Sequence, residues 1–139
     1  MIGIVIVTHS ALADELLMAT QQIVGTVEGF EPISIDPSEP VDEVEKRIKK
    51  GIKKVDTGDG ILIMTDMFGG TPSNISLSFL EKGKVEIVTG VNLPMLIKLS
   101  TLREEKTLDE LASFIKSYGQ KNIHLASEIL DRKTEGESK

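Results

Sequence analysis

Short apolar runs rich in isoleucine and valine alternate along this chain with longer segments in which apolar residues recur every three or four positions. A short apolar run is typical of a buried strand, and the wider spacing is typical of a helix with one face on the core. The predicted strands are 2–7, 30–35, 60–64 and 85–89, and the predicted helices are 11–24, 41–55, 71–82, 95–102 and 107–118. Strands that alternate with helices predict an α/β fold with a doubly wound, mainly parallel central sheet flanked by helices.

The last part of the chain has a different pattern. Asn122–Ala126 reads as a short final strand, which could lie antiparallel at an edge of the sheet. From Leu130 the sequence is polar and charged, and it predicts a frayed tail. The length of 139 residues suits one domain, so we expect a single domain over residues 1–127 and a charged C-terminal tail over 128–139.

Composition narrows the classes of function. The chain has 16 basic and 22 acidic residues, a net charge of −6, which disfavours nucleic acid as the main partner. It has no cysteine, which excludes disulfides and thiolate sites. No apolar run reaches the roughly 18 residues of a membrane span, and the first strand lacks the basic flank of a signal peptide. These features are compatible with a reducing cytosol without establishing it. The basic run at 46–54 is expected to be a solvated helix face.

Polar residues follow two of the predicted strands directly. Thr8, His9 and Ser10 follow the first strand, and Asp66 and then Gly69–Thr71 follow the third. The carboxyl ends of parallel strands share one edge of the sheet, so we expect His9 and Asp66 to meet there. A histidine paired with an aspartate is an oriented nucleophile or base. Two glycines and a hydroxyl ahead of Pro72 suit an anion site, with an ordinary tight turn capped by Thr71 as the alternative.

Three stretches of the chain resemble the mannose-family IIA component of the bacterial phosphoenolpyruvate-dependent sugar phosphotransferase system. They are Thr8–Ser10, Asp66–Asn74 and Gly90–Leu96, in the family's order and spacing. The resemblance covers about residues 1–126, nearly the whole chain. In the similar family the short last strand is exchanged with a second subunit, so the resemblance implies a homodimer.

The chemistry of histidine fits a phosphoryl relay. A neutral imidazole nitrogen is a good nucleophile towards phosphorus, and the phosphoramidate that forms is energetic enough to be passed on. The resemblance implies that His9 is the acceptor. We expect Asp66 to accept a hydrogen bond from Nδ1–H and to leave Nε2 for the phosphoryl group. The N–H groups of Gly69, Gly70 and Thr71, with the Thr71 hydroxyl, are expected to bind the phosphoryl oxygens.

Neighbouring residues receive smaller roles. Phe68 is expected at the rim as a partner contact, with core packing as the alternative. Ser73 and Asn74 are expected to cap the following helix. His124 lies outside the motifs and is expected to be a structural or surface residue.

The resemblance also implies partners and a reaction class. It implies a phosphotransferase component that accepts the phosphoryl group from phospho-HPr and passes it to a IIB component for sugar uptake and phosphorylation. The membrane IIC and IID components are reached indirectly, which suggests a cytoplasmic protein that can associate peripherally with the permease. No cofactor is implied. The alternative is a regulatory phosphoprotein module, in which the phosphorylation state of His9 controls a partner without sugar transport.

Other families with phosphate or nucleotide chemistry fit less well. A response-regulator receiver requires an acidic pair after the first strand, where this chain has its histidine. A histidine phosphatase requires several phosphate-binding arginines, whereas the three arginines here lie away from both loops. A flavodoxin requires stacking aromatics, and this chain has one Tyr and no Trp. A metal ion would need a third ligand, and the strand-end loops offer only Asp36, so no metal is predicted. A dihydroxyacetone-kinase phosphotransfer subunit is closely related, but it usually lacks the Gly-Gly-Thr-Pro pattern.

Overall fold

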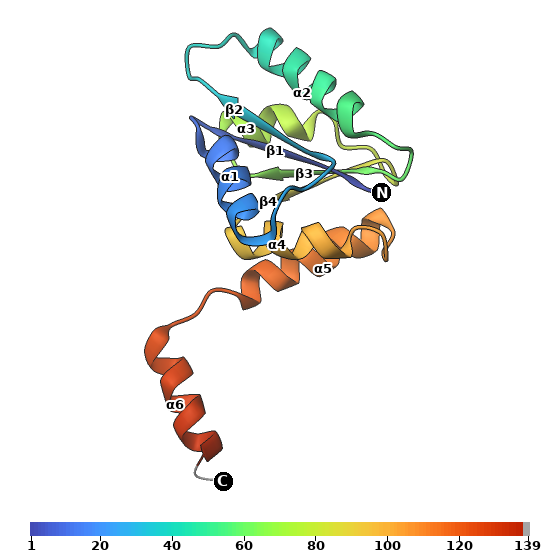
Figure 1. Cartoon of the computed structure of the whole chain (residues 1–139). Coiled ribbons are helices and arrows are strands. Elements are labelled where there is room, and N and C mark those ends of the chain that lie inside the picture. Colours follow the sequence, from blue (N-terminus) through green and yellow to red (C-terminus); the bar gives the residue numbers. More distant parts are fainter. Residues whose placement is uncertain (138–139) are drawn as a thin grey trace.

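The structure is a computed structural model that describes residues 1–137, with the side chains of residues 1–132. Strands and helices alternate along most of the chain (Figure 1). In chain order the elements are β1 (Gly3–His9), α1 (Leu12–Val24), β2 (Phe30–Ile35), α2 (Val41–Val55), β3 (Ile61–Thr65), α3 (Thr71–Leu77), β4 (Val85–Thr89), α4 (Leu93–Leu102), α5 (Leu108–Lys121) and α6 (Ala126–Glu137). The predicted α/β class is confirmed.

The four strands of the described chain form one parallel sheet in the order β2-β1-β3-β4. Helices cover both faces of this sheet, so the fold is doubly wound. Alternate residues of β1 show the two layers: Ile4 and Ile6 pack with α1, α4 and α5, whereas Val5 and Val7 pack with α2 and α3. The chain reverses its direction of winding between β1 and β3. A crevice is expected at such a switch point, outside the carboxyl ends of the strands. We call the edge of the sheet formed by these carboxyl ends the C-terminal edge.

Two helices end differently from the prediction. Helix α5 was predicted to end at residue 118, but it continues to Lys121, with Gly119 buried inside it. A Cβ atom on Gly119 would lie 2.5 Å from Sδ of Met95, so this glycine serves the close approach of α4 to α5. Helix α3 ends at Leu77 rather than near residue 82, because Ser78, Phe79 and Leu80 bond to carbonyls three residues back and tighten the chain into turns.

The described chain on its own does not form the predicted final strand. Asn122 closes α5 through bonds from its N–H and its Nδ2 to the Tyr118 carbonyl, and Ala126 already begins α6. The segment between them, residues 122–125, has no neighbouring strand in the described chain, and a strand exists only where it pairs. Exchange of this segment with a second subunit stays a prediction.

The expected frayed tail is also helical as far as the structure describes it. Helix α6 spans Ala126–Glu137 and stands away from the body in Figure 1. It crosses the predicted boundary between residues 127 and 128, and the division into a domain and a tail stays a prediction. Within the described chain, none of the helices has the length and hydrophobicity to cross a membrane.

Candidate functional site

His9 and Asp66 meet at the C-terminal edge, as the sequence predicted. His9 is the last residue of β1, and Asp66 follows the last residue of the adjacent strand β3. Oδ2 of Asp66 accepts a hydrogen bond from the His9 main-chain N–H at 2.9 Å and lies 2.7 Å from Nδ1 of the His9 ring. One carboxylate oxygen therefore fixes both the backbone and the ring of His9.

This contact determines which ring nitrogen is free. An ionised carboxylate only accepts hydrogen bonds, so the His9 nitrogen that faces Asp66 must carry the proton. Nδ1 is then the donor, and the lone pair of the neutral ring lies on Nε2. The His9 side chain is 51% exposed and the Asp66 side chain 13%, so the nucleophilic ring remains open to a partner while the carboxylate that orients it is shielded.

The environment keeps Asp66 ionised. Partial burial raises the pKa of Asp66. Hydrogen bonds from the His9 N–H, the His9 ring and the Met67 N–H together lower it by more than burial raises it, so the net pKa of Asp66 lies below its usual value. The Met67 N–H donates to Oδ1 at 2.9 Å, so both carboxylate oxygens are engaged. Asp66 is therefore a carboxylate at neutral pH, as the orientation of the His9 ring requires.

The glycine loop lies against the free side of the ring. A Cβ atom on Gly70 would come within 2.6 Å of Cε1 and 3.0 Å of Nε2 of His9, so only glycine leaves room here. Gly69 has φ of +90°, a backbone conformation that residues with a side chain rarely adopt. In the described chain the N–H groups of Gly69, Gly70 and Thr71 have no acceptor. Free donors thus lie close to the nitrogen with the lone pair.

The predicted caps of α3 are wrong. Gly70 is the N-cap, and no side chain caps the helix. Because α3 begins at Thr71, both Ser73 and Asn74 lie inside its first turn and cannot cap it. Ser73 is fully buried, and its hydroxyl has no hydrogen-bond partner among the described residues. The hydroxyl of Thr71 makes no capping bond, so the alternative of a turn capped by Thr71 is also wrong.

A cavity of about 230 Å³ opens beside His9. Three parts of the chain form its walls: His9 and Ser10 at the end of β1, Thr71 and Pro72 at the start of α3, and the loop after β2. That loop, residues 36–39, was not recognised as part of the site. Its position follows from strand order, because Ile35 pairs with His9 across the sheet and accepts a hydrogen bond from the Ser10 N–H at 2.8 Å.

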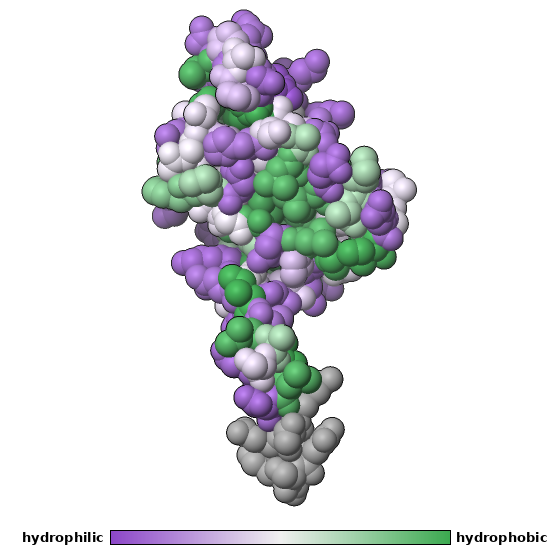
Figure 2. Space-filling model, turned by 90° about the vertical axis from the view of Figure 1, so that its left-hand side faces the viewer, coloured by the Kyte–Doolittle hydropathy of each residue, from purple (hydrophilic) through white to green (hydrophobic). Residues whose placement is uncertain are grey.

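The surface of the C-terminal edge is partly apolar. Phe68 is 71% exposed and Met67 is 55% exposed, so the core-packing alternative for Phe68 is wrong. Leu12 and Val41, at the starts of α1 and α2, are also exposed. Figure 2, which faces the side where β1 leads into α1, shows apolar residues gathered in the middle of the body between polar ones. A protein partner could bury such a surface.

The third family stretch lies at the same edge but has a structural role. The Val91 N–H donates to the Thr65 carbonyl at 2.9 Å, which holds the loop after β4 beside the end of β3. Asn92 caps α4, because its Oδ1 accepts a hydrogen bond from the Met95 N–H, and its Nδ2 donates to the Gly119 carbonyl.

Across the described chain there is no group of three His, Cys, Asp or Glu residues arranged to hold a metal ion.

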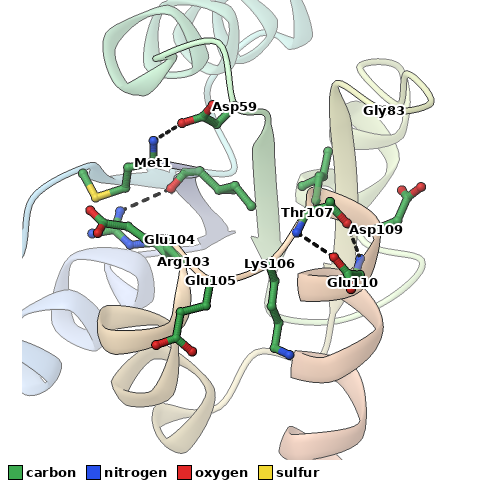
Figure 3. Close-up of a pocket in the computed structure, with 12 residues that line it drawn as sticks. Met1, Asp59, Gly83, Arg103, Glu104, Glu105, Lys106, Thr107, Asp109 and Glu110 are labelled. Atoms are coloured by element: carbon green, nitrogen blue, oxygen red, sulfur yellow. Dashed lines mark hydrogen bonds and ion pairs between the residues drawn. The ribbon is translucent and has the colours of Figure 1, made fainter.

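A second cavity, of about 670 Å³, lies around the N-terminus and the loop between α4 and α5, away from His9 (Figure 3). Arg103 in its wall is buried, stacks on Phe30 at 4.7 Å, and donates from Nη1 to the Ile2 carbonyl at 3.3 Å. Met1 binds Asp59 through its amino group, also at this cavity. These contacts tie the α4–α5 loop and the N-terminus to the sheet, and we assign them a structural role. His124 is exposed in the segment between α5 and α6.

The sequence and the fold both have relatives. A family sequence model described as "PTS system fructose IIA component" (EIIA-man) matches residues 3–116. The chain is 27% identical over 133 residues to the fructose-specific EIIA component of Bacillus subtilis, covering 95% of this chain and 91% of that one. It is 31% identical over 124 residues to the mannose-specific EIIAB component of Escherichia coli, covering 88% of this chain but 38% of that longer protein.

The similarity extends to a solved structure. The EIIA phosphotransferase component of Streptococcus agalactiae superposes with a TM-score of 0.83 at 26% identity, covering 92% of this chain and 99% of that one. The family match spans both halves of the site, from the strand that ends at His9 to the loop that follows Asp66. The chain therefore belongs to the EIIA-man family of sugar phosphotransferase system IIA components.

Proposed function

We propose that this chain is a phosphocarrier in which His9 accepts a phosphoryl group from phospho-HPr and donates it to a IIB component for sugar uptake. The observation that carries the proposal is the division of the His9 ring, with Nδ1 held by Asp66 at 2.7 Å and Nε2 facing the glycine loop. In the transfer, the lone pair of Nε2 forms a bond to phosphorus while the bond from phosphorus to the donor's histidine nitrogen breaks. The proton stays on Nδ1, and Asp66 stabilises the positive charge that develops on the ring.

The glycine loop would hold the phosphoryl group. A transferring phosphoryl group is positioned and stabilised mainly by electrostatic contacts with its three outer oxygens. The unengaged N–H groups of Gly69, Gly70 and Thr71 and the Thr71 hydroxyl are the candidate donors on the Nε2 side of the ring. The relay needs no cofactor of its own.

The exposed apolar residues at the C-terminal edge would form the docking surface. Phe68 and Met67 follow Asp66 directly and stay exposed, so a partner that reaches His9 would cover them. The same surface would serve the donor and the IIB acceptor in turn, in the cytoplasm and close to the membrane IIC and IID components.

We also propose a homodimer in which the segment 122–125 is exchanged. Among the described residues β4 is an edge strand whose outer side is unpaired after the isolated bridge between Val85 and Glu81, and a groove of about 360 Å³ lined in part by Phe68, Ile87 and Val88 runs beside it. Ile123 and Leu125 are 77% and 62% exposed. An unpaired edge and an unpaired apolar segment of the same chain can satisfy each other across a two-fold axis.

The test is phosphorylation with the general phosphotransferase enzymes, phosphoenolpyruvate and magnesium. The protein should gain one acid-labile phosphoryl group per chain, and His9→Ala should abolish this. His124→Ala is the matched control, because His124 is also exposed but lies outside the site, and it should label fully. Full labelling of His9→Ala, or phosphate that survives acid, would refute a phosphohistidine at position 9.

A further inference from the structure

The residues that line the cavity beside His9 include an acid, Asp36, that the proposed phosphoryl relay does not use. Asp36 follows Ile35, which pairs with His9 in the sheet, so the loop after β2 lies beside the acceptor histidine. The loop is ordered by its own hydrogen bonds. Oδ1 of Asp36 accepts from the Ser38 N–H at 2.8 Å and from the Ser38 hydroxyl at 2.6 Å, which lowers the pKa of Asp36 and keeps it ionised.

The two acidic residues of this loop differ in whether a cation balances their negative charge. Glu39 is paired with Arg47, whose Nη1 lies 2.7 Å and 2.8 Å from its two carboxylate oxygens. Asp36 has no ion-pair partner among the described residues, and its Oδ2 receives no hydrogen bond from them. None of the described residues that line the cavity is a lysine or an arginine. The cavity therefore presents the carboxylate of Asp36 as its uncompensated charge.

A phosphoryl group in transfer brings further negative charge to this place. Sites that transfer phosphoryl groups place cations or metal ions against the equatorial oxygens, either from the same chain or from a partner. Here the nearby donors of this chain are neutral, namely backbone N–H groups and hydroxyls. A cation that enters the cavity would meet the phosphoryl group on one side and Asp36 on the other, and both contacts would be favourable.

We propose that Asp36 anchors a basic side chain of the phosphoryl donor in the cavity beside His9. The inference rests on the proposed function, because it concerns the docked donor at the same site. Asp36 would be a positioning residue that acts through the partner's cation, and it would favour donors with a basic group beside their phosphohistidine. An exposed charge at the margin of an interface acts mainly on the association rate, and salt screens its effect.

The experiment measures single-turnover transfer from phospho-HPr to the chain at low and high salt. Asp36→Asn keeps an oxygen that can accept from Ser38, so the loop should be preserved while the charge is lost. Asp56→Asn is the matched control, because Asp56 also accepts from the N–H two residues on, at 2.9 Å, but lies at the far end of α2. We expect Asp36→Asn to slow the second-order rate about five-fold at low salt, with the difference falling below about two-fold near 0.5 M salt.

Each outcome separates this inference from the proposed function. Asp36→Glu restores the charge and should recover most of the rate, which a purely structural role of Asp36 would not predict. If Asp36→Asn and Asp56→Asn transfer equally well, or if Asp36→Asn is faster than the unmodified protein, the anchoring role is refuted while His9 remains the acceptor. If the unmodified protein takes no phosphoryl group from phospho-HPr, the proposed function itself fails.

Discussion

Replacing Gly70 by alanine tests whether the ring of His9 must stay where the structure places it. The backbone of Gly70 has φ of −91° and ψ of 170°, which any residue can adopt, so the change introduces no backbone strain. Its effect is the contact of the new Cβ with the ring, 2.6 Å from Cε1 and 3.0 Å from Nε2. Carbon atoms in favourable contact are about 3.5 to 4.0 Å apart, so the ring must move by about 1 Å.

The magnitude follows from this displacement. The His9 side chain is half exposed and can swing towards solvent, which breaks its contact with Asp66 and turns Nε2 away from the loop donors. A misplacement of about 1 Å in a reacting group can lower a rate about 100-fold, which is about 2.7 kcal/mol of barrier. The free energy of unfolding should change by less than about 1 kcal/mol, because the lost hydrogen bond is exposed and alanine reduces the freedom of the unfolded chain.

Gly58→Ala is the matched control. Gly58 has φ of +96°, and no atom lies within 4 Å of the position that an alanine methyl would take, so alanine there strains the backbone without touching a neighbour. It lies in the loop before β3, at the end of the strand opposite the site. We expect it to cost about 1 to 2 kcal/mol of stability and to leave transfer unchanged.

Two measurements on the same preparations decide the matter: urea unfolding for stability and rapid-quench transfer from phospho-HPr for the rate. Gly70→Ala should transfer slowly and unfold normally, and Gly58→Ala should do the reverse. Transfer by Gly70→Ala at the rate of the unmodified protein would refute the claim that the loop and the ring are fitted to each other. A second reading is the proton resonances of the His9 ring, which should shift only in Gly70→Ala.

Three further changes test other parts of the structure. Asp66→Asn should slow transfer by roughly 2–4 kcal/mol of barrier and spoil the preference for Nε2, as nitrogen NMR of the phosphorylated ring would show. The pKa of Asp66 in the folded state lies below its unfolded value of about 3.9, so the stability that this carboxylate provides is present above that pH and is lost as the pH falls through the folded pKa. The difference in unfolding free energy between the unmodified protein and Asp66→Asn should therefore shrink on acidification. A difference that is unchanged at pH 3 would contradict this. Gly119→Ala should lower thermal stability by about 1 to 2 kcal/mol, since overpacking against Met95 outweighs the gain in helix propensity, and a stabilised variant would show that α4 and α5 can separate freely. Deleting residues 122–139 should yield monomers or aggregates in sedimentation, whereas an intact dimer would refute exchange of this segment.

The periodicity of the sequence was sufficient for most of the fold. The bounds of β2, α2 and β4 agree with the predicted ranges, and Thr107 and Glu110, three positions apart as a capping box requires, form that box at the start of α5. These features are local, because a strand's apolar run or a helix's cap depends on residues a few positions apart. The meeting of His9 and Asp66 was also predictable, because parallel strands carry their carboxyl ends to one edge.

Sequence position misled where a residue's role depends on a distant neighbour. Gly119 is of the residue type that commonly ends helices, yet it lies inside α5. A glycine is needed there because the Met95 side chain occupies the space that a Cβ atom would take. Residues 122–125 have the pattern of a strand, but hydrogen bonds of a strand require a partner, and the described chain provides none beside them.

The amino-acid sequence by itself determined the succession of elements from β1 to α5 and singled out His9 and Asp66, because each is encoded in residue type and short-range spacing. Only the tertiary structure decided how closely Gly70 approaches the His9 ring and that Asp36 lines the cavity beside it. These properties depend on the order of β2, β1 and β3 in the sheet and on distances of a few ångströms between residues far apart in the chain, and the spacing of residues along a sequence contains neither.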